Sequence, residues 1–424
     1  SPLGIPDFRR LWLADVISLL GDWAGRLALT VLVLDRTGSP AWAAAVTAVS
    51  LAGFVGIGQV LATFADRYGR VSVMLVADVA RAALFVSMLL PLPVGGLLVL
   101  AFLAGLATPP FEAARSAALP DLVPEERYGD ALALAGISVQ SSLVVGYALG
   151  GLLLSVVEPE AALAINAFSF LVSAGLLVQL RESAAAEPAS SGSSVGRSLG
   201  DGAYALYGDP MVRRALVLVA CTGALGTVGE ALVVPYAADV GFGDRMLGVL
   251  AASVPIGTLV GTAVISNGAR DHRTLLRNAA WCATVTAALA APLFWLEVGG
   301  AGAFLAFVLA GGMFAVSIPT NTVIGMRLPR DARASAMGIA VGALMGSQAL
   351  GAAIGGVGAS AVGAGRAIAV ALTFAAAFGV WSVVTTPVDA KHLLRTRRRP
   401  EPVRVIDLDA LERSAPPVDR IPVS

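Results

Sequence analysis

Twelve predominantly apolar stretches, each of roughly 20 residues or more, run along this chain of 424 residues. A helix of about 20 apolar residues is long enough to cross the hydrocarbon core of a bilayer. The stretches are continuously apolar rather than alternating, which favours helices over the strands of a membrane β-barrel. We therefore predict an all-α membrane protein with twelve transmembrane helices. The expected spans are approximately 11–34, 41–62, 72–92, 94–114, 131–156, 160–180, 213–237, 246–267, 275–296, 301–325, 334–361 and 366–386.

The composition argues against a water-soluble protein. Hydrophobic residues make up 57% of the chain and charged residues only 14%, whereas soluble domains carry roughly 25% charged residues. Soluble multidomain enzymes, nucleic-acid-binding proteins and disordered chains are disfavoured for this reason. The formal net charge of +0 provides no overall field that would attract nucleic acid, so we expect no nucleic-acid partner.

The positions of the Lys and Arg residues predict the orientation of the spans. Of the 29 such residues, Arg36, Arg245 and Arg366 fall on one side, and Arg26 and Arg81 fall inside spans. All the others fall on the opposite side, which the positive-inside rule identifies as the cytoplasm. Arg, Ala and Gly are abundant, as in proteins of high-GC bacteria. We expect a multi-pass protein of the bacterial inner (plasma) membrane with both termini cytoplasmic.

A long polar stretch divides the spans into two groups of six. It contains Ser-Ser-Gly-Ser-Ser at 190–194, a composition typical of a flexible linker. The predicted organisation is an N-terminal six-helix bundle at 1–181, a cytoplasmic linker at 182–210, a C-terminal six-helix bundle at 211–386 and a cytoplasmic tail at 387–424.

The two groups of spans resemble each other at an offset of about 205 residues. The fifth span carries Gly146, Gly150 and Gly151, and the eleventh carries Gly351, Gly355 and Gly356 at the matching positions. Two duplicated six-helix halves joined by a linker are typical of transporters that rock around a central site. The repeat therefore predicts two pseudo-symmetric bundles with a site between them.

The loop between the second and third spans carries a family signature. Residues 62–70 read Ala-Thr-Phe-Ala-Asp-Arg-Tyr-Gly-Arg and resemble the loop motif G-x-L-A-D-R-x-G-R-K of the major facilitator superfamily. Asp66, Arg67, Gly69 and Arg70 match the motif. With the twelve spans and the repeat, the resemblance covers the chain to about residue 386. It implies a major facilitator fold in which these four residues form a cytoplasmic gate that holds the outward-open state.

Other stretches are similar to one branch of this superfamily. Residues 8–13, 78–81 and 110–124 look like the drug-exporter branch, which includes macrolide efflux proteins, the enterobactin exporter and lysophospholipid transporters. The fifth span resembles the exporters' G-P-x-x-G-G motif, with a Tyr where Pro is usual, at Gly146, Tyr147, Gly150 and Gly151. The resemblance implies a secondary active transporter that exports a small amphipathic compound, a drug-like molecule or a metabolite, by proton antiport and alternating access.

Ionisable residues inside the spans are candidates for the coupling site, because a charge within the bilayer is costly unless it is paired or hydrated. The first span carries Asp22 and Arg26 at the i,i+4 spacing that allows a pair. The third carries Asp78 and Arg81, and the seventh carries Glu230.

We predict that the carboxylates of Asp22 and Glu230 bind protons or a cationic cargo, because a carboxylate in an apolar cavity can hold a proton near neutral pH. Arg26 and Arg81 are the expected switchable partners. The alternative is that these are static pairs that fix helix packing, and for Asp78 and Arg81 we favour that alternative.

The resemblance places the first, fourth, seventh and tenth spans around the cargo cavity. The tenth span offers Phe307, Met313, Phe314 and Asn321 as candidate cargo contacts. Met and Phe side chains suit adaptable binding of apolar cargo. Simple packing or lipid contact is the competing explanation for such residues.

The sequence carries no sign of an enzyme, a metal site or a cofactor. No nucleotide-binding loop is present, because Lys391 is the only Lys in the chain. Two Cys and two His residues provide neither metal-ligand spacing nor a catalytic group. The expected partners are a small amphipathic molecule, protons and membrane lipids. Because one chain contains both halves, we expect a monomer.

Several functional alternatives stay open at this stage. A lysophospholipid or lipid carrier and a dedicated siderophore exporter fit the same resemblance. A non-transporting membrane receptor or scaffold belongs to a different class of function, and the gate motif argues against it. The residues fix neither the cargo nor whether its movement is coupled to protons.

Overall fold

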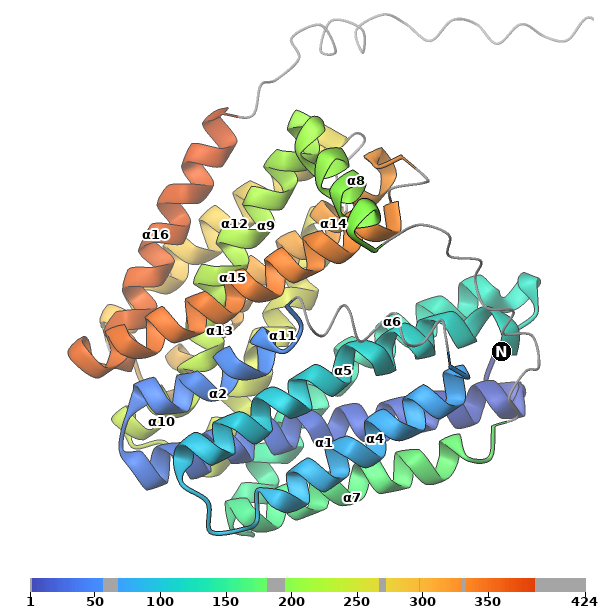
Figure 1. Cartoon of the computed structure of the whole chain (residues 1–424). Coiled ribbons are helices and arrows are strands. Elements are labelled where there is room, and N and C mark those ends of the chain that lie inside the picture. The colour runs from blue at the N-terminus through green and yellow to red at the C-terminus, as the bar shows by residue number, and fades with distance from the viewer. Residues whose placement is uncertain are drawn as a thin grey trace, which may run out of the picture. The chain divides into compact units, whose positions relative to one another are not determined.

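The computed structural model describes residues 2–55, 68–180, 195–266, 272–296, 298–329 and 333–385, which all belong to one compact unit, Ser1–Thr386. These residues form helices and no strand (Figure 1), as predicted. Each of the twelve predicted spans contains a described helix. The elements are η1 (Pro2–Gly4), α1 (Pro6–Thr37), α2 (Pro40–Ala52), α4 (Arg70–Ser87), α5 (Val94–Leu122), α6 (Glu125–Leu154), α7 (Pro159–Leu177), α8 (Val195–Gly208), α9 (Pro210–Ala231), α10 (Val233–Val240), α11 (Asp244–Ser266), α12 (His272–Trp295), α13 (Gly300–Gly311), η3 (Gly312–Val316), α14 (Ser317–Arg327), α15 (Arg333–Val362) and α16 (Ala364–Thr385).

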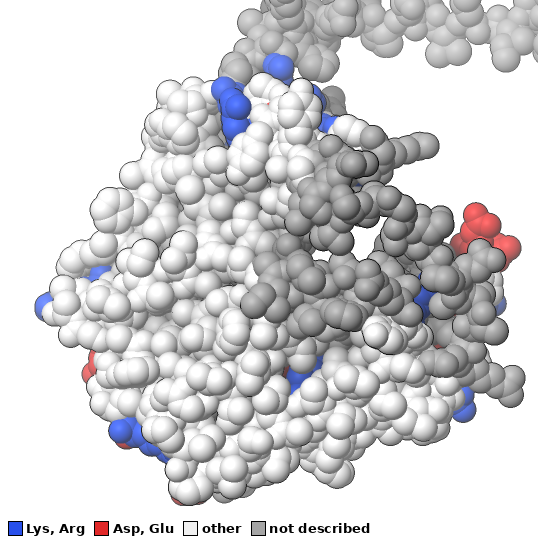
Figure 2. Space-filling view, in the orientation of Figure 1, with Lys and Arg blue, Asp and Glu red and all other residues white. Residues whose placement is uncertain are grey.

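Length and composition allow many of these helices to cross a bilayer. Within the described ranges, nine helical segments are long and apolar enough to do so. They do not include α2, whose described part has 13 residues, α4, which carries Arg70, Asp78 and Arg81 within 18 residues, or α12. Large apolar side chains such as Phe168, Leu350 and Phe374 are exposed. Figure 2 shows that the described surface in this view is almost entirely uncharged, which suits contact with lipid tails.

Small residues let the helices within each half approach closely. A Cβ atom added at Gly25 of α1 would lie 2.3 Å from Nδ2 of Asn166 on α7. In the other half, a Cβ atom added at Gly257 of α11 would lie 1.8 Å from the carbonyl oxygen of Val308 on α13. Such contacts are typical of membrane helix pairs, in which small residues allow the backbones to meet.

The seventh and tenth spans, which the sequence predicts as continuous helices, are interrupted. α9 ends at Ala231 and α10 begins at Val233, while α13 passes into the 3₁₀ turn η3 at Gly312. Each interruption lies just before a proline, Pro235 or Pro319. A proline has no N–H to donate and its ring clashes with the carbonyl group four residues earlier. The proline therefore removes one helical hydrogen bond next to each break, although α5, α11 and α12 continue through internal prolines.

The predicted flexible linker at 182–210 is partly an ordered helix. α8 begins at Val195 and packs against α9 and α15. Leu206 is completely buried, and a Cβ atom added at Gly202 would lie 2.5 Å from Oγ of Ser335. Burial of this apolar face explains why a Gly- and Ser-rich stretch still folds. Residues 181–194 and the tail at 387–424 lie outside the described residues.

Asp209 joins the start of α9 to the end of α14. Its Oδ1 accepts a hydrogen bond from the N–H group of Met211 at 2.7 Å, and its Oδ2 accepts one from Nε of Arg327 at 2.7 Å. Partial burial acts to raise the pKa of Asp209, but the hydrogen bonds from Arg327 and Met211 lower it below its ordinary value overall. The ionised carboxylate is therefore the form that stabilises this corner.

Replacing Asp209 with Ala is expected to cost about 1 kcal/mol of unfolding free energy, because the helix loses its N-cap. The pKa of Asp209 is lowered by folding, so its contribution is present above its ordinary pKa of roughly 3.9 and is lost as the pH falls through the folded value. Thermal unfolding in detergent between pH 7 and pH 3 measures this. The difference between the two proteins should be constant down to about pH 5 and then vanish. Asp130→Ala, at an exposed position on α6, is the control and should show no such difference.

Candidate functional site

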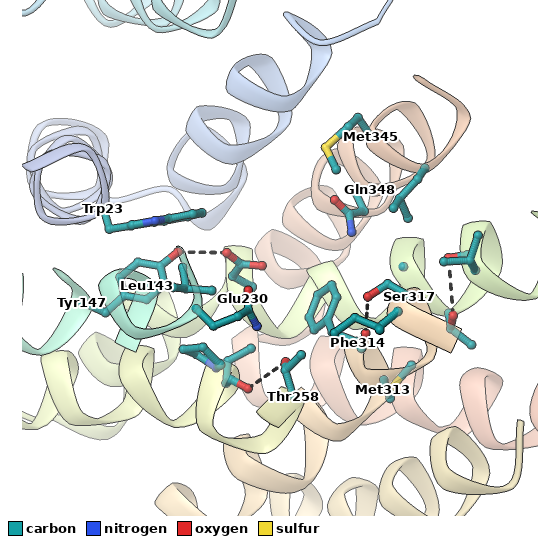
Figure 3. Close-up of a pocket in the computed structure, with 18 residues that line it drawn as sticks. Trp23, Leu143, Tyr147, Glu230, Thr258, Met313, Phe314, Ser317, Met345 and Gln348 are labelled. Atoms are coloured by element: carbon teal, nitrogen blue, oxygen red, sulfur yellow. Dashed lines mark hydrogen bonds between the residues drawn. The ribbon is translucent and has the colours of Figure 1, made fainter. Parts of the chain in front are cut away.

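A cavity of about 280 Å³ lies between the two halves. α1 and α6 contribute to its wall from the first half, and α9, α11, η3, α14 and α15 contribute from the second. Most of the wall is apolar or aromatic, and Glu230 is the only Asp, Glu, Lys, Arg or His among the lining residues that the structure describes. Figure 3 shows the aromatic, methionine and polar side chains that surround the space, including Trp23, Tyr147, Phe314, Met313, Gln348 and Ser317.

Glu230 is hydrogen-bonded to a residue of the opposite half. The hydroxyl group of Tyr147 on α6 donates to Oε1 of Glu230 on α9 at 2.8 Å (Figure 3). The ring of Tyr147 packs against that of Trp23 with centroids 5.3 Å apart. Tyr147 stands where the exporters' motif has Pro, so the departure from the motif supplies the donor. The sequence-based reasoning gave Tyr147 no partner, because no spacing rule connects residues so far apart in the chain.

Asp22 and Arg26 form an ion pair next to Trp23. Arg26 Nη2 lies 3.7 Å from Oδ2 of Asp22, and the guanidinium group lies 4.7 Å from the centroid of the Trp23 ring. Neither residue lines the cavity, but Arg26 is close enough to Glu230 for an electrostatic interaction. The structure thus gathers three of the predicted coupling residues near Trp23: Glu230 lines the cavity, and Asp22 and Arg26 lie outside its lining.

Asp78 and Arg81 lie elsewhere, in the packed interior of the first half. Arg81 Nη2 donates to Oδ1 of Asp78 at 2.5 Å, and the hydroxyl group of Ser173 donates to Oδ2 at 2.6 Å. The guanidinium group lies 4.6 Å from the ring centroid of Phe111 and 4.5 Å from that of Phe170. Both charged residues are buried. This arrangement favours the packing role over that of a switchable partner.

A third charged cluster, to which the sequence-based reasoning assigned no role, links α1 to α5. Arg115 Nη1 lies 3.3 Å from Oδ2 of Asp15, and its Nη2 lies 2.6 Å from Oε2 of Glu112. Part of this cluster is predictable from the sequence, because Glu112 and Arg115 are one helical turn apart and can form an ion pair. Asp15 lies on the same predicted face of the first span as Asp22.

The gate motif is only partly described. Asp66 and Arg67 lie outside the described residues. Gly69 directly precedes α4, and Arg70 is the first residue of that helix. The guanidinium group of Arg70 forms an ion pair with Asp121 near the end of α5. This contact ties two helices of the first half together at the predicted cytoplasmic end.

The glycines of the fifth-span motif divide their contacts between the two halves. Gly146 and Gly150 face α1 of their own half, but a Cβ atom added at Gly151 would lie 2.2 Å from Cα of Gly248 in the other half. The repeat-related glycines of α15 behave in the same way: Gly351 and Gly355 face α9, and Gly356 faces Ala44 of α2. The third glycine of each set therefore brings the two halves together at the end opposite to the N-terminus of α1.

The four candidate cargo contacts of the tenth span occupy different environments. Met313 and Phe314 line the cavity. Phe307 does not, since it is completely buried with its ring 5.0 Å from that of Phe294, and we assign it to the core. Asn321 is partly exposed on α14 and is not a lining residue. The break at η3 separates the cavity-facing residues from the packed ones.

Comparison with known proteins agrees with this architecture. The sequence pattern of the Major Facilitator Superfamily matches residues 11–340. The "Uncharacterized MFS-type transporter YfiS" of Bacillus subtilis is 26% identical over 366 residues, which cover 84% of this chain and 88% of the relative. Macrolide efflux protein A of Streptococcus pyogenes is 27% identical over 173 residues, which cover 39% of this chain and 42% of that protein.

Solved transporter structures share the fold at low sequence identity. A bacterial homologue of the human lysosomal transporter Spinster, in an inward-facing conformation, has a TM-score of 0.69 at 16% identity and covers 94% of this chain and 99% of that one. A D-xylose–proton symporter has a TM-score of 0.68 at 15% identity, with coverages of 90% and 98%. These relatives are transporters rather than enzymes. The chain belongs to the Major Facilitator Superfamily and has its multi-pass, all-helical fold of twelve transmembrane helices in two six-helix bundles.

Proposed function

We propose that this chain is a secondary active transporter that exports a small amphipathic compound by proton antiport and alternating access. The observation that carries the proposal is the hydrogen bond from Tyr147 to Glu230, which places one ionisable group both at the cavity and at the junction of the halves. The partial similarity to a macrolide efflux protein supports export. We place the protein in the bacterial plasma membrane as a monomer with both termini cytoplasmic, following the distribution of Arg residues.

The chemistry of the site explains how protons and cargo compete. Glu230 as a carboxylate accepts a charge-assisted hydrogen bond from Tyr147 and attracts a cationic or hydrogen-bonding cargo. A proton on Glu230 removes that attraction. Separating the halves breaks the contact with Tyr147 and admits water, so the proton affinity of Glu230 depends on which side the cavity faces. Cargo and proton are then exchanged on the same carboxylate.

The cavity restricts the size of the cargo in this conformation. Its volume of about 280 Å³ lies at the small end of the roughly 300–1,000 Å³ typical of sites for drug-sized ligands. Met313, Phe314 and Met345 line it, and methionine side chains adapt to irregular apolar shapes. A larger amphipathic cargo requires the halves to separate further.

Replacing Glu230 with Gln is expected to abolish cargo-driven proton movement. The variant keeps the shape of the side chain and an acceptor for Tyr147 but cannot release a proton at this position. Purified protein in liposomes with an imposed pH gradient and an internal pH-sensitive dye measures proton flux as amphipathic drugs, siderophores and lysolipids are added one at a time. Asp35→Asn, at an exposed position near the end of α1, is the matched control and should behave like the wild type.

The outcomes of this experiment distinguish between the candidate functions. Proton movement triggered by one cargo class and lost only in Glu230→Gln supports the proposal and names the cargo. Full proton coupling in Glu230→Gln contradicts the assignment of this residue. Cargo movement without protons in the wild type indicates a facilitator or lipid carrier, and absence of any flux across the panel favours a receptor or scaffold.

A further inference from the structure

A second cavity lies entirely within the first half, near the predicted cytoplasmic end. Its volume is about 380 Å³, and its wall comes from α1, α5 and α6. Asp15 and Arg115 lie in this wall together with the aromatic side chains of Phe8, Trp12 and Tyr128. It shares no lining residue with the cavity at Glu230.

The charges around this cavity are unbalanced. Two carboxylates, Asp15 and Glu112, share the single guanidinium group of Arg115, which gives the cluster a formal charge of −1. Arg115 is held by Glu112 at 2.6 Å but approaches Asp15 only to 3.3 Å. Arg115 is therefore paired mainly with Glu112, and its contact with Asp15 is the longer of the two.

Asp15 also has an unused oxygen atom. The residue is only 2% exposed, and among the described residues its Oδ1 has no hydrogen-bond partner. An unsatisfied polar atom in such a position costs free energy. A cation or a proton that reaches Asp15 from the cavity would remove this cost.

The surroundings select an organic cation over a bare metal ion. The cavity is much larger than a single ion requires, and most of its wall is apolar. Aromatic faces stabilise ammonium groups by cation–π interaction, and Phe8, Trp12 and Tyr128 supply three aromatic rings. We propose that this cavity binds small aromatic amines, with Asp15 as the counter-ion of the ammonium group.

The location of the cavity fits a role in cargo uptake. This role rests on the proposed function, whereas amine binding does not. An amine bound here from the cytoplasm would be held near the central cavity before the halves close around it. This identifies cationic amphiphiles as the cargo class. Binding is measured without transport, so the failure of this inference and the failure of proton antiport are distinguishable.

Binding of 2-(1-naphthyl)ethylamine to the full chain in lipid nanodiscs tests the proposal, measured by equilibrium dialysis at neutral pH. The neutral analogue 2-(1-naphthyl)ethanol has the same ring and chain length. Every protein in this comparison carries Glu230→Gln, so the central cavity offers the amine no second carboxylate. The protein with Asp15 intact is expected to bind the amine at least about 10-fold more tightly than the alcohol, and Asp15→Asn should lose this preference because the counter-ion is gone. Equal amine affinity with and without Asp15→Asn would overturn the proposal.

A second pair of variants guards against misfolding of Asp15→Asn. Gly136 lines the cavity, and a Cβ atom added there meets nothing within 4 Å. Gly136→Phe leaves Asp15 itself unchanged, and it should fill part of the space and lower amine affinity by about 10-fold or more. Gly129 of the same helix also has open space around an added Cβ atom but does not line the cavity, so Gly129→Phe should bind like the wild type. Unchanged amine binding in Gly136→Phe also contradicts the site.

Discussion

Replacing Arg81 with Leu is expected to cost about 3–5 kcal/mol of unfolding free energy, because the substitution leaves the buried carboxylate of Asp78 without its counter-ion. Asp78 is 0% exposed and also accepts a hydrogen bond from the hydroxyl group of Ser173. The substitution also removes the cation packed between Phe111 and Phe170. Denaturant-induced unfolding of the purified protein in detergent, followed by circular dichroism, measures the effect.

The double variant Asp78→Asn with Arg81→Leu separates packing from function. Removing both charges should recover most of the stability, since no isolated charge stays buried. If the pair serves packing, the double variant transports cargo against a proton gradient at a rate near that of the wild type. A stable double variant without proton coupling would show instead that the pair takes part in proton transfer.

Replacing Gly151 with Leu is expected to hold the two halves apart at the end opposite to the N-terminus of α1. A Cβ atom at this position overlaps Cα of Gly248, whereas Gly146 and Gly150 pack within their own half. Overpacking costs about 1–3 kcal/mol. A penalty of this size, applied only to the closed arrangement, shifts the balance between conformations by roughly 5–150-fold.

Reactivity of a cysteine at Ala44 measures this shift. Ala44 of α2 is completely buried and faces Gly356 of α15 in the other half, so a cysteine there is covered when the halves meet. In a chain with Cys221 and Cys282 replaced by Ala, Gly151→Leu should raise the rate of labelling by a membrane-impermeant maleimide by about 10-fold. Gly257→Leu clashes within one half and should reduce folding instead. No change in labelling with Gly151→Leu contradicts the role of this contact.

The membrane fold is predictable from the sequence because long apolar runs have few alternative structures. The pair of Asp22 and Arg26 is predictable for a similar reason, since helical spacing alone brings the side chains together. The contact of Tyr147 with Glu230 depends on how two halves meet, and no local pattern encodes that.

The tenth span shows a second limit. Phe307, Met313 and Phe314 are equally apolar in the sequence, but only the last two face the cavity. Their separation follows from the 3₁₀ turn at η3, which changes the angular position of every later residue. The helix α8 is a similar case. Its Gly and Ser residues favour a loop in the sequence, and the burial of Leu206, which stabilises the helix, is seen only in the structure.

The break before Pro235 makes α10 a short helix that is connected to α9 through Leu232. Its eight residues contact α1 and α2 of the first half and also α11 and α16 of the second. Pro235 leaves the carbonyl group of Ala231 without its usual helical donor, which lowers the resistance to bending at Leu232. Asp239 on α10 accepts a hydrogen bond from the N–H group of Ala364 at the start of α16. The end of the seventh span and the start of the twelfth are therefore linked, so a bend at Leu232 would move them together without the rotation of a whole bundle.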